Sequence, residues 1–150
     1  MRDIEFKIFP AKKEDYVEIV DVWEASVRET HDFLTENDIA RLKPLVLNTY
    51  LDAVDLDCVK NEAGEIVGFI GIQGDRIEML FIDPDYRGKS VGKFLTRYAT
   101  EEVGATKVDV NEQNTQAVGF YEHLGFEVIG RSPFDGQGKP FPLLHMKKRD

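Results

Sequence analysis

The stretch Arg87-Gly88-Lys89-Ser90-Val91-Gly92 follows an apolar run at residues 77–82 and opens a segment whose apolar residues recur at helical spacing. A strand that ends in a glycine-containing turn and continues into a helix directs several backbone N–H groups at one point. The helix dipole favours an anion there, and glycine lets a ligand approach the backbone closely. The stretch therefore predicts a binding site for a phosphate or pyrophosphate group.

The distribution of charge agrees with a small anionic ligand. The net charge of −9 argues against general nucleic-acid binding, which needs a basic face. Between residues 87 and 99 the chain has no acidic residue and four basic ones: Arg87, Lys89, Lys93 and Arg97. A local cationic patch on an acidic chain suits a small anion better than a polyanion, although a solvated helix face is the alternative.

Length and composition predict one globular domain spanning residues 1–150, with 42% hydrophobic and 31% charged residues. No apolar run approaches the roughly 20 residues that a membrane span requires, and the first residues lack the apolar core of a secretory signal. The single cysteine, Cys58, excludes an internal disulfide and a cysteine-based zinc site. Three scattered histidines show no ligand spacing, so no metal is expected. These features favour the cytoplasm.

The remaining pattern alternates strands and helices, as is typical of an α/β domain. The predicted strands lie at residues 4–9, 57–60, 65–73, 76–82, 107–110, 126–131 and 141–146. The predicted helices lie at residues 13–29, 35–50 and 90–102, and from the N-cap Asn114 to a C-cap glycine, Gly125. Pro10 is expected to end the first strand, and Pro44 weakens the second helix.

Two common phosphate-binding motifs do not fit the turn. A P-loop that ends in Gly88-Lys89-Ser90 requires its first glycine at position 83, which is Asp83. A dinucleotide-binding motif requires G-x-G-x-x-G, which residues 88–92 do not supply.

The turn instead resembles the acetyl-coenzyme A loop of the GCN5-related N-acetyltransferase (GNAT) family. The family pattern Arg/Gln-x-x-Gly-x-Gly/Ala falls on Arg87, Ser90 and Gly92, with Ser90 replacing the usual glycine. Serine argues against a backbone conformation with positive φ at this position. Downstream, residues 114–126 (NTQAVGFYEHLGF) are similar to the family segment N-x-x-A-x-x-x-Y-x-x-x-G-F. Residues 30–34 and 135–145 look like a small, mostly uncharacterised bacterial subgroup.

The resemblance covers nearly the whole chain and implies the GNAT fold. That fold is a mixed, mostly antiparallel sheet of about seven strands with about four helices, splayed between the fourth and fifth strands. The pantetheine arm of acetyl-CoA would lie between residues 78–83 and 107–111, with its pyrophosphate at residues 87–92. The residues expected to contact the coenzyme are Leu80, Phe81, Ile82, Arg87, Gly88, Lys89, Ser90, Val91, Gly92, Lys93, Asn114 and Tyr121.

Acyl transfer to an amine needs a base, an oxyanion site and a proton for the leaving thiolate. A lysine-like amine has a pKa near 10.4, so a base helps to neutralise it. Glu78, a polar residue in an apolar strand, is the candidate; an exposed position on an alternating strand is the alternative. By resemblance, Tyr121 is the general acid, although it also suits a core aromatic position. By the same resemblance, a backbone N–H near residues 80–81 stabilises the oxyanion.

The acceptor site is the least determined part of the sequence. Thr30 and His31 lie between the first two helices, where this fold builds its acceptor site, and a turn or cap role is their alternative. Trp23 is a further substrate candidate, although its helical spacing is more typical of a core residue. The resulting hypothesis is an acetyl-CoA-dependent N-acetyltransferase that moves the acetyl group directly to a primary amine of a small molecule or a lysine. The alternative is a non-catalytic acyl-CoA-binding sensor. The sequence leaves four points open: the identity of the acceptor, the length of the acyl chain, the residue that acts as the base, and the oligomeric state, for which a homodimer is one option.

Overall fold

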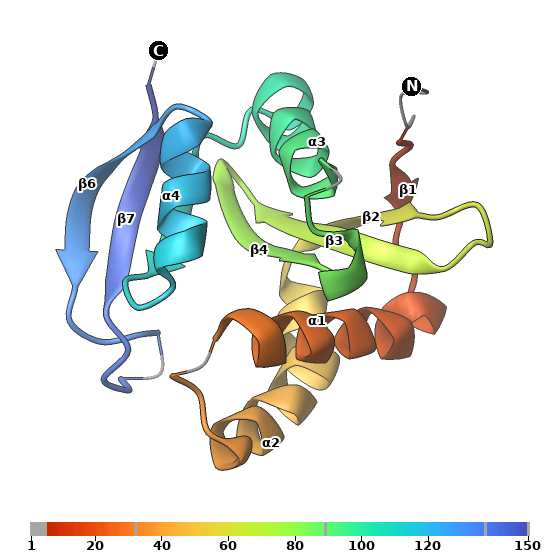
Figure 1. Cartoon of the computed structure of the whole chain (residues 1–150), viewed down its shortest axis with the longest axis horizontal. Helices are drawn as coiled ribbons and strands as arrows, with labels where there is room; N and C mark the ends of the chain where they lie inside the picture. The colour runs from red at the N-terminus through yellow and green to blue at the C-terminus, as the bar shows by residue number, and fades with distance from the viewer. Residues whose placement is uncertain (1–5, 32, 89, 137, 150) are drawn as a thin grey trace.

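A mixed seven-stranded sheet runs through the chain, whose computed structural model describes residues 6–31, 33–88, 90–136 and 138–149 (Figure 1). The strand order is β1-β2-β3-β4-β5-β7-β6, and every neighbouring pair is antiparallel except the parallel pair β4–β5. The strands are β1 (Phe9–Pro10), β2 (Asp55–Lys60), β3 (Ile66–Gln73), β4 (Arg76–Ile82), β5 (Lys107–Asn111), β6 (Phe126–Ser132) and β7 (Leu143–Lys148). The predicted fold class, a mixed and mostly antiparallel sheet, is confirmed.

Four α-helices cover the sheet: α1 (Tyr16–Thr30), α2 (Glu36–Leu45), α3 (Val91–Arg97) and α4 (Thr115–His123). Wider helical turns extend α2 through Val46–Tyr50 and α3 through Tyr98–Val103, so the predicted lengths of both helices hold. Figure 1 shows α3 and α1 on opposite sides of β3 and β4, with α4 against β7 and β6. The buried apolar residues accordingly form two clusters, one towards α3 and α4 and one towards α1 and α2.

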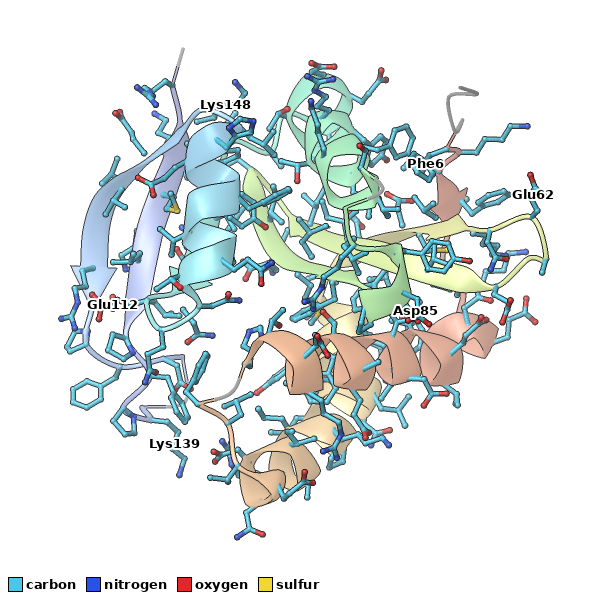
Figure 2. The ribbon with its side chains drawn as sticks, viewed as in Figure 1. Phe6, Glu62, Asp85, Glu112, Lys139 and Lys148 are labelled. Carbon is cyan, nitrogen blue, oxygen red and sulfur yellow. The ribbon has the colours of Figure 1, made fainter. Side chains whose placement is uncertain are left out.

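The first strand differs from its prediction. Among the described residues it contains only Phe9 and Pro10, and Pro10, its last residue, pairs with Asp57. The reason is that β1 lies at the edge of the sheet, where a residue without an N–H group is tolerated. Ile4 and Glu5 lie outside the described residues. Before the strand, Phe6 packs against Phe94 of α3, with 5.5 Å between ring centroids (Figure 2).

The predicted splay between β4 and β5 is present. These strands pair only at Arg76–Lys107 and Ile77–Val108, whereas β5 pairs with β7 from Lys107 to Asn111. On its other side β4 carries a bulge, because Ile72 pairs with Ile77 and Gly71 with Met79, which leaves Glu78 without an opposite residue. A bulge bends its strand, and here it coincides with the point where β4 leaves β5. The two strands thus form a V that closes at residues 77 and 108.

In the described part of the chain, no helix has the length and apolar character needed to span a lipid bilayer.

Candidate functional site

A cavity of about 390 Å³ lies where β4 and β5 separate. Its walls come from the end of β4, the turn before α3 and the start of α3, one side of α4 with its cap, and the end of α1. Most of the residues predicted to contact the coenzyme line it: Leu80, Phe81, Ile82, Arg87, Gly88, Ser90, Val91, Gly92, Asn114 and Tyr121. Lys93 instead lines a second, polar groove between α3 and the end of β7, beside Lys148 (Figure 2). Lys89 lies outside the described residues.

The turn before α3 has the backbone of an anion-binding loop. Gly88 has φ 73°, and Ser90 has φ 69° and ψ 13°, the left-handed conformation. The expectation that serine would avoid positive φ is therefore wrong; among the described residues, Ser90 is the one non-glycine residue with positive φ. The conformation persists because Ser90 begins α3, where its carbonyl accepts a hydrogen bond from the Phe94 N–H at 2.9 Å. Successive N–H groups in such a turn form a concave site for an anion.

Replacement of Ser90 by glycine is expected to stabilise the protein. A side chain in the left-handed conformation costs about 1–2 kcal/mol, and the added chain entropy of glycine offsets about 0.5–1 kcal/mol of the relief. We expect a net gain of about 0.5–1 kcal/mol, seen as a thermal midpoint about 1–4 °C higher for a chain of this size. Ser90→Ala keeps the Cβ atom and should show no gain. A lower midpoint for Ser90→Gly would contradict the conformational argument.

Close packing holds the turn against the sheet and α4. A Cβ atom on Gly92 would lie 3.3 Å from Cζ of Phe120, and one on Gly68 of β3 would lie 2.9 Å from Ile82. From the other side, a guanidinium N–H of Arg87 donates to the carbonyl of Ser26 at 3.3 Å, which joins the turn to α1. These contacts join the described residues of the turn to the sheet, α4 and α1. This arrangement fits a diphosphate at the turn and an extended arm along β4.

Two polar residues of the α4 segment face this cavity. Asn114 caps α4, since its Oδ1 accepts the Ala117 N–H at 3.1 Å, which confirms the predicted cap. Tyr121 is only 5% exposed, and its ring contacts Phe120 and Phe126. Burial raises the pKa of the Tyr121 phenol, so the hydroxyl stays protonated at neutral pH. Tyr121 therefore belongs to the core and to the cavity wall at once.

Glu78 does not line the cavity. Its exposed side chain lies at the bulge of β4, close enough to Arg76 and Asp109 to interact with their charges. The surrounding protein partly desolvates its carboxyl and raises its pKa; the charge of Asp109 adds to this rise, and Arg76 opposes it.

The candidate acceptor residues separate into two groups. Thr30 and His31 line the cavity, whereas Trp23 is 5% exposed, packs in the core and is not part of the cavity wall. Thr30 Oγ1 donates to the Ser26 carbonyl at 2.8 Å and lies 2.8 Å from Nδ1 of His31. Because the hydroxyl proton is used towards Ser26, the Nδ1–H of His31 is the donor in the second bond.

An aromatic row that the sequence did not indicate extends from this point to the surface. The ring of His31 lies 6.2 Å from that of Phe81 and 5.2 Å from that of Phe33. Phe33 in turn lies 5.8 Å from Phe141, which precedes β7. The row joins the α1–α2 connection to the β6–β7 connection, two segments about 100 residues apart in the chain.

A second feature missed by the sequence is a hydrogen-bonded row across the sheet. Nη1 of Arg76 donates to Oδ2 of Asp109 at 2.6 Å, and Nδ1 of His145 lies 2.6 Å from Oδ1 of the same carboxylate. Nε2 of His145 lies 2.7 Å from Oγ of Ser132. Since the four residues come from β4, β5, β7 and β6, no local sequence motif predicts this row.

Comparison with known proteins places the chain in a family. Residues 36–149 match the family model described as the acetyltransferase (GNAT) domain. The chain is 42% identical over 136 residues to the peptidyl-lysine N-acetyltransferase YjaB of Salmonella typhimurium, covering 91% of this chain and 93% of that protein. It is 28% identical to the peptidyl-lysine N-acetyltransferase YiaC of Escherichia coli, over 79% of this chain and 82% of that protein.

Solved structures agree. The solution structure of apo-YjaB from E. coli superposes with a TM-score of 0.86 at 40% identity, over 96% of this chain and 97% of that chain. The PaiA N-acetyltransferase from Thermoplasma acidophilum, solved in complex with coenzyme A, shares the fold with a TM-score of 0.75 at 20% identity. The match covers 97% of this chain and 100% of that chain. Motif, fold and relatives converge, and the chain belongs to the GNAT family, as an N-acetyltransferase that transfers an acetyl group from acetyl-CoA to an amine.

Proposed function

We propose that residues 1–150 form one catalytic domain that acetylates the side-chain amine of lysine in a peptide or protein. The observation that carries this proposal is the shared cavity at the V, where the anion-binding turn, Tyr121 and the α1–α2 residues Thr30 and His31 meet. The curated relatives at 42% and 43% identity, both named peptidyl-lysine N-acetyltransferases, support a lysine acceptor. The alternative of a non-catalytic coenzyme sensor is not favoured.

We assign coenzyme binding to the residues at the end of β4, in the turn and at the start of α4. The coenzyme supplies an acetyl group activated as a thioester. The turn from Arg87 to Gly92 binds the pyrophosphate through backbone N–H groups, and the splayed end of β4 at Leu80–Ile82 binds the extended arm. The free N–H groups of a splayed strand suit an amide-containing arm, since an unpaired buried backbone group is costly.

Tyr121 acts as the acid and Glu78 as the base in this proposal. Tyr121 keeps its proton at neutral pH and donates it as negative charge develops on the leaving sulfur. Glu78 lies on the opposite side of the V and takes the proton of the incoming amine through water. The two groups thus serve the two ends of the transfer from opposite faces of the sheet. A backbone N–H at residues 80–81 stabilises the oxyanion.

The aromatic row explains why a lysine side chain fits. His31 lines the cavity, and its ring continues through Phe33 to Phe141 as a row of aromatic side chains. The four methylene groups of lysine pack on such a row while the terminal nitrogen reaches the thioester. A compact amine without an aliphatic arm gains nothing from these contacts.

A direct test uses three acceptors with the purified protein and acetyl-CoA. We expect mass spectrometry to find the acetyl group on the lysine Nζ of a peptide whose N-terminus is blocked. A matched peptide with norleucine in place of lysine is the control and should stay unmodified. Acetylation of spermidine or of a free N-terminal amine, with none on the lysine peptide, would contradict the proposed acceptor.

A further inference from the structure

Ser26 is a polar residue buried in the wall of the cavity. It belongs to α1, is only 5% exposed, and lines the cavity together with residues of β4 and of the turn. The residues that the sequence predicts to contact the coenzyme come from β4, the turn, α3 and the α4 segment, and none of them comes from α1. The chemical role of Ser26 at this wall is therefore unassigned.

The hydroxyl of Ser26 has no partner in the described part of the chain. The side chains that bond Ser26 reach its main-chain carbonyl, which accepts from Nη2 of Arg87 at 3.3 Å and from Oγ1 of Thr30 at 2.8 Å. A hydroxyl within a helix commonly donates to the carbonyl four residues earlier, as Thr30 does to Ser26 and Thr96 does to Gly92. Among the described residues, no bond of this kind or any other engages Oγ of Ser26.

This unpaired hydroxyl opens into the cavity. Among the described side chains, the one wholly enclosed polar atom without a hydrogen bond is Oδ1 of Asn111. Oγ of Ser26 is not enclosed in this way, so it retains accessible surface, and the cavity is the space that Ser26 lines. A buried hydroxyl without a hydrogen bond is costly, and native proteins rarely contain one. The hydroxyl is therefore placed to bond a group that enters the cavity.

The bond to Arg87 determines which part of the cavity Ser26 faces. Arg87 opens the anion-binding turn, and its guanidinium reaches the Ser26 carbonyl, so α1 passes beside the turn that follows β4 (Figure 1). Phe81 of β4 packs in the cluster under α1 and lines the same cavity. Ser26 thus lies beside both the turn and the end of β4, the two segments assigned to the pyrophosphate and the arm of the coenzyme.

We propose that Ser26 binds the pantetheine arm of the coenzyme, with its hydroxyl donating to an amide carbonyl of that arm. The proposal rests on the proposed function, which places the arm along the end of β4. An amide carbonyl that leaves water for a buried site needs a donor, and the Ser26 hydroxyl supplies one from α1. Thr30, one turn further along α1, cannot take this role, because its hydroxyl proton is used towards the Ser26 carbonyl. α1 then forms a third wall of the coenzyme site, beside β4 and the α4 segment.

Ser26→Ala removes the hydroxyl and little else. The bonds from Arg87 and Thr30 use the main-chain carbonyl, so the substitution keeps both, and alanine is a better helix former than serine. The thermal midpoint of the free protein should therefore not fall. The Kd for coenzyme A, measured by isothermal titration calorimetry, should rise about three- to tenfold, as expected for the loss of one neutral hydrogen bond. The acetyl-CoA KM should rise by the same factor, with kcat and the peptide KM within about twofold of the wild type.

A fragment of the coenzyme separates a contact with the arm from a general loss of binding. 3′-Phosphoadenosine 5′-diphosphate is the nucleotide part of coenzyme A without the arm, and its Kd should agree within about twofold between the wild type and Ser26→Ala. Thr100→Val is the matched control, because Oγ1 of Thr100 donates to the Arg97 carbonyl at 3.3 Å and Thr100 does not line the cavity. This control should leave both Kd values unchanged.

The outcomes that would overturn the proposal are distinct. They are an unchanged Kd of Ser26→Ala for coenzyme A, an equal loss of affinity for coenzyme A and for the nucleotide, or a thermal midpoint lowered by more than about 3 °C, which would give the hydroxyl a role in the fold. A rise in the peptide KM alone would assign Ser26 to the acceptor and would also overturn it. If the wild type binds coenzyme A but acetylates no lysine peptide, the proposed acceptor fails, and the two titrations still test Ser26.

Discussion

Replacement of Tyr121 by phenylalanine is expected to lower kcat about 10²- to 10⁴-fold, the usual contribution of a general acid. The phenylalanine ring preserves the contacts with Phe120 and Phe126 and removes only the hydroxyl at the cavity wall. Because the substitution leaves the turn and β4 untouched, the acetyl-CoA KM should change less than threefold. Initial rates of thiol release over a range of acetyl-CoA concentrations measure both quantities.

Tyr98→Phe is the matched control for this substitution. The Tyr98 hydroxyl donates to Asp57 at 2.9 Å, and Tyr98 does not line the cavity. Loss of the Tyr98 hydroxyl removes one hydrogen bond, worth about 1 kcal/mol of stability, and should leave kcat unchanged. A Tyr121→Phe enzyme with wild-type kcat would remove the acid role from Tyr121 and leave it a core aromatic.

Replacement of Ser90 by aspartate is expected to raise the acetyl-CoA KM about 30- to 150-fold. Like charges about 6–8 Å apart at an effective dielectric constant of about 20 repel by about 2–3 kcal/mol, which corresponds to that factor. Aspartate suits the position in other respects, because it tolerates positive φ and is a good residue at the start of a helix. The change therefore alters the charge at the turn and leaves its conformation intact.

Ser90→Asn supplies the control, since asparagine has the same shape and the same tolerance of positive φ without the charge. We expect its acetyl-CoA KM within about threefold of the wild type, and an unchanged peptide KM for both variants. Equal acetyl-CoA KM values for the aspartate and asparagine variants would mean that no phosphate group lies near residue 90.

Features formed by residues that are contiguous in the chain were predictable from the sequence. The turn and α4 each lie within about 13 residues, so their spacing indicates a turn and a helix directly, although the positive φ of Ser90 was not expected. The capping side chain of Asn114 followed from such a local pattern, whereas the cavity position of Tyr121 was expected only through the resemblance. The splay could be expected only through the resemblance, because the bulge at Glu78 depends on how β3 and β4 pair.

Features assembled from distant strands were not predictable. The row from Arg76 to Ser132 draws one residue from each of four strands, and the aromatic row joins Phe33 to Phe141. Nothing in the local pattern distinguishes these residues from ordinary surface positions. Trp23, a substrate candidate whose alternative was a core position, packs in the core that α1 shares with β3, and helical spacing alone could not separate these two positions.

The central claim is that the cavity at the V binds acetyl-CoA. Titration of the ¹⁵N-labelled protein with coenzyme A, followed by backbone NMR shifts, tests it most directly. The predicted result is that the largest shifts fall on residues 80–82, 87–92 and 114–121. Shifts confined to the groove of Lys93, Arg97 and Lys148, with none on these segments, would contradict the account.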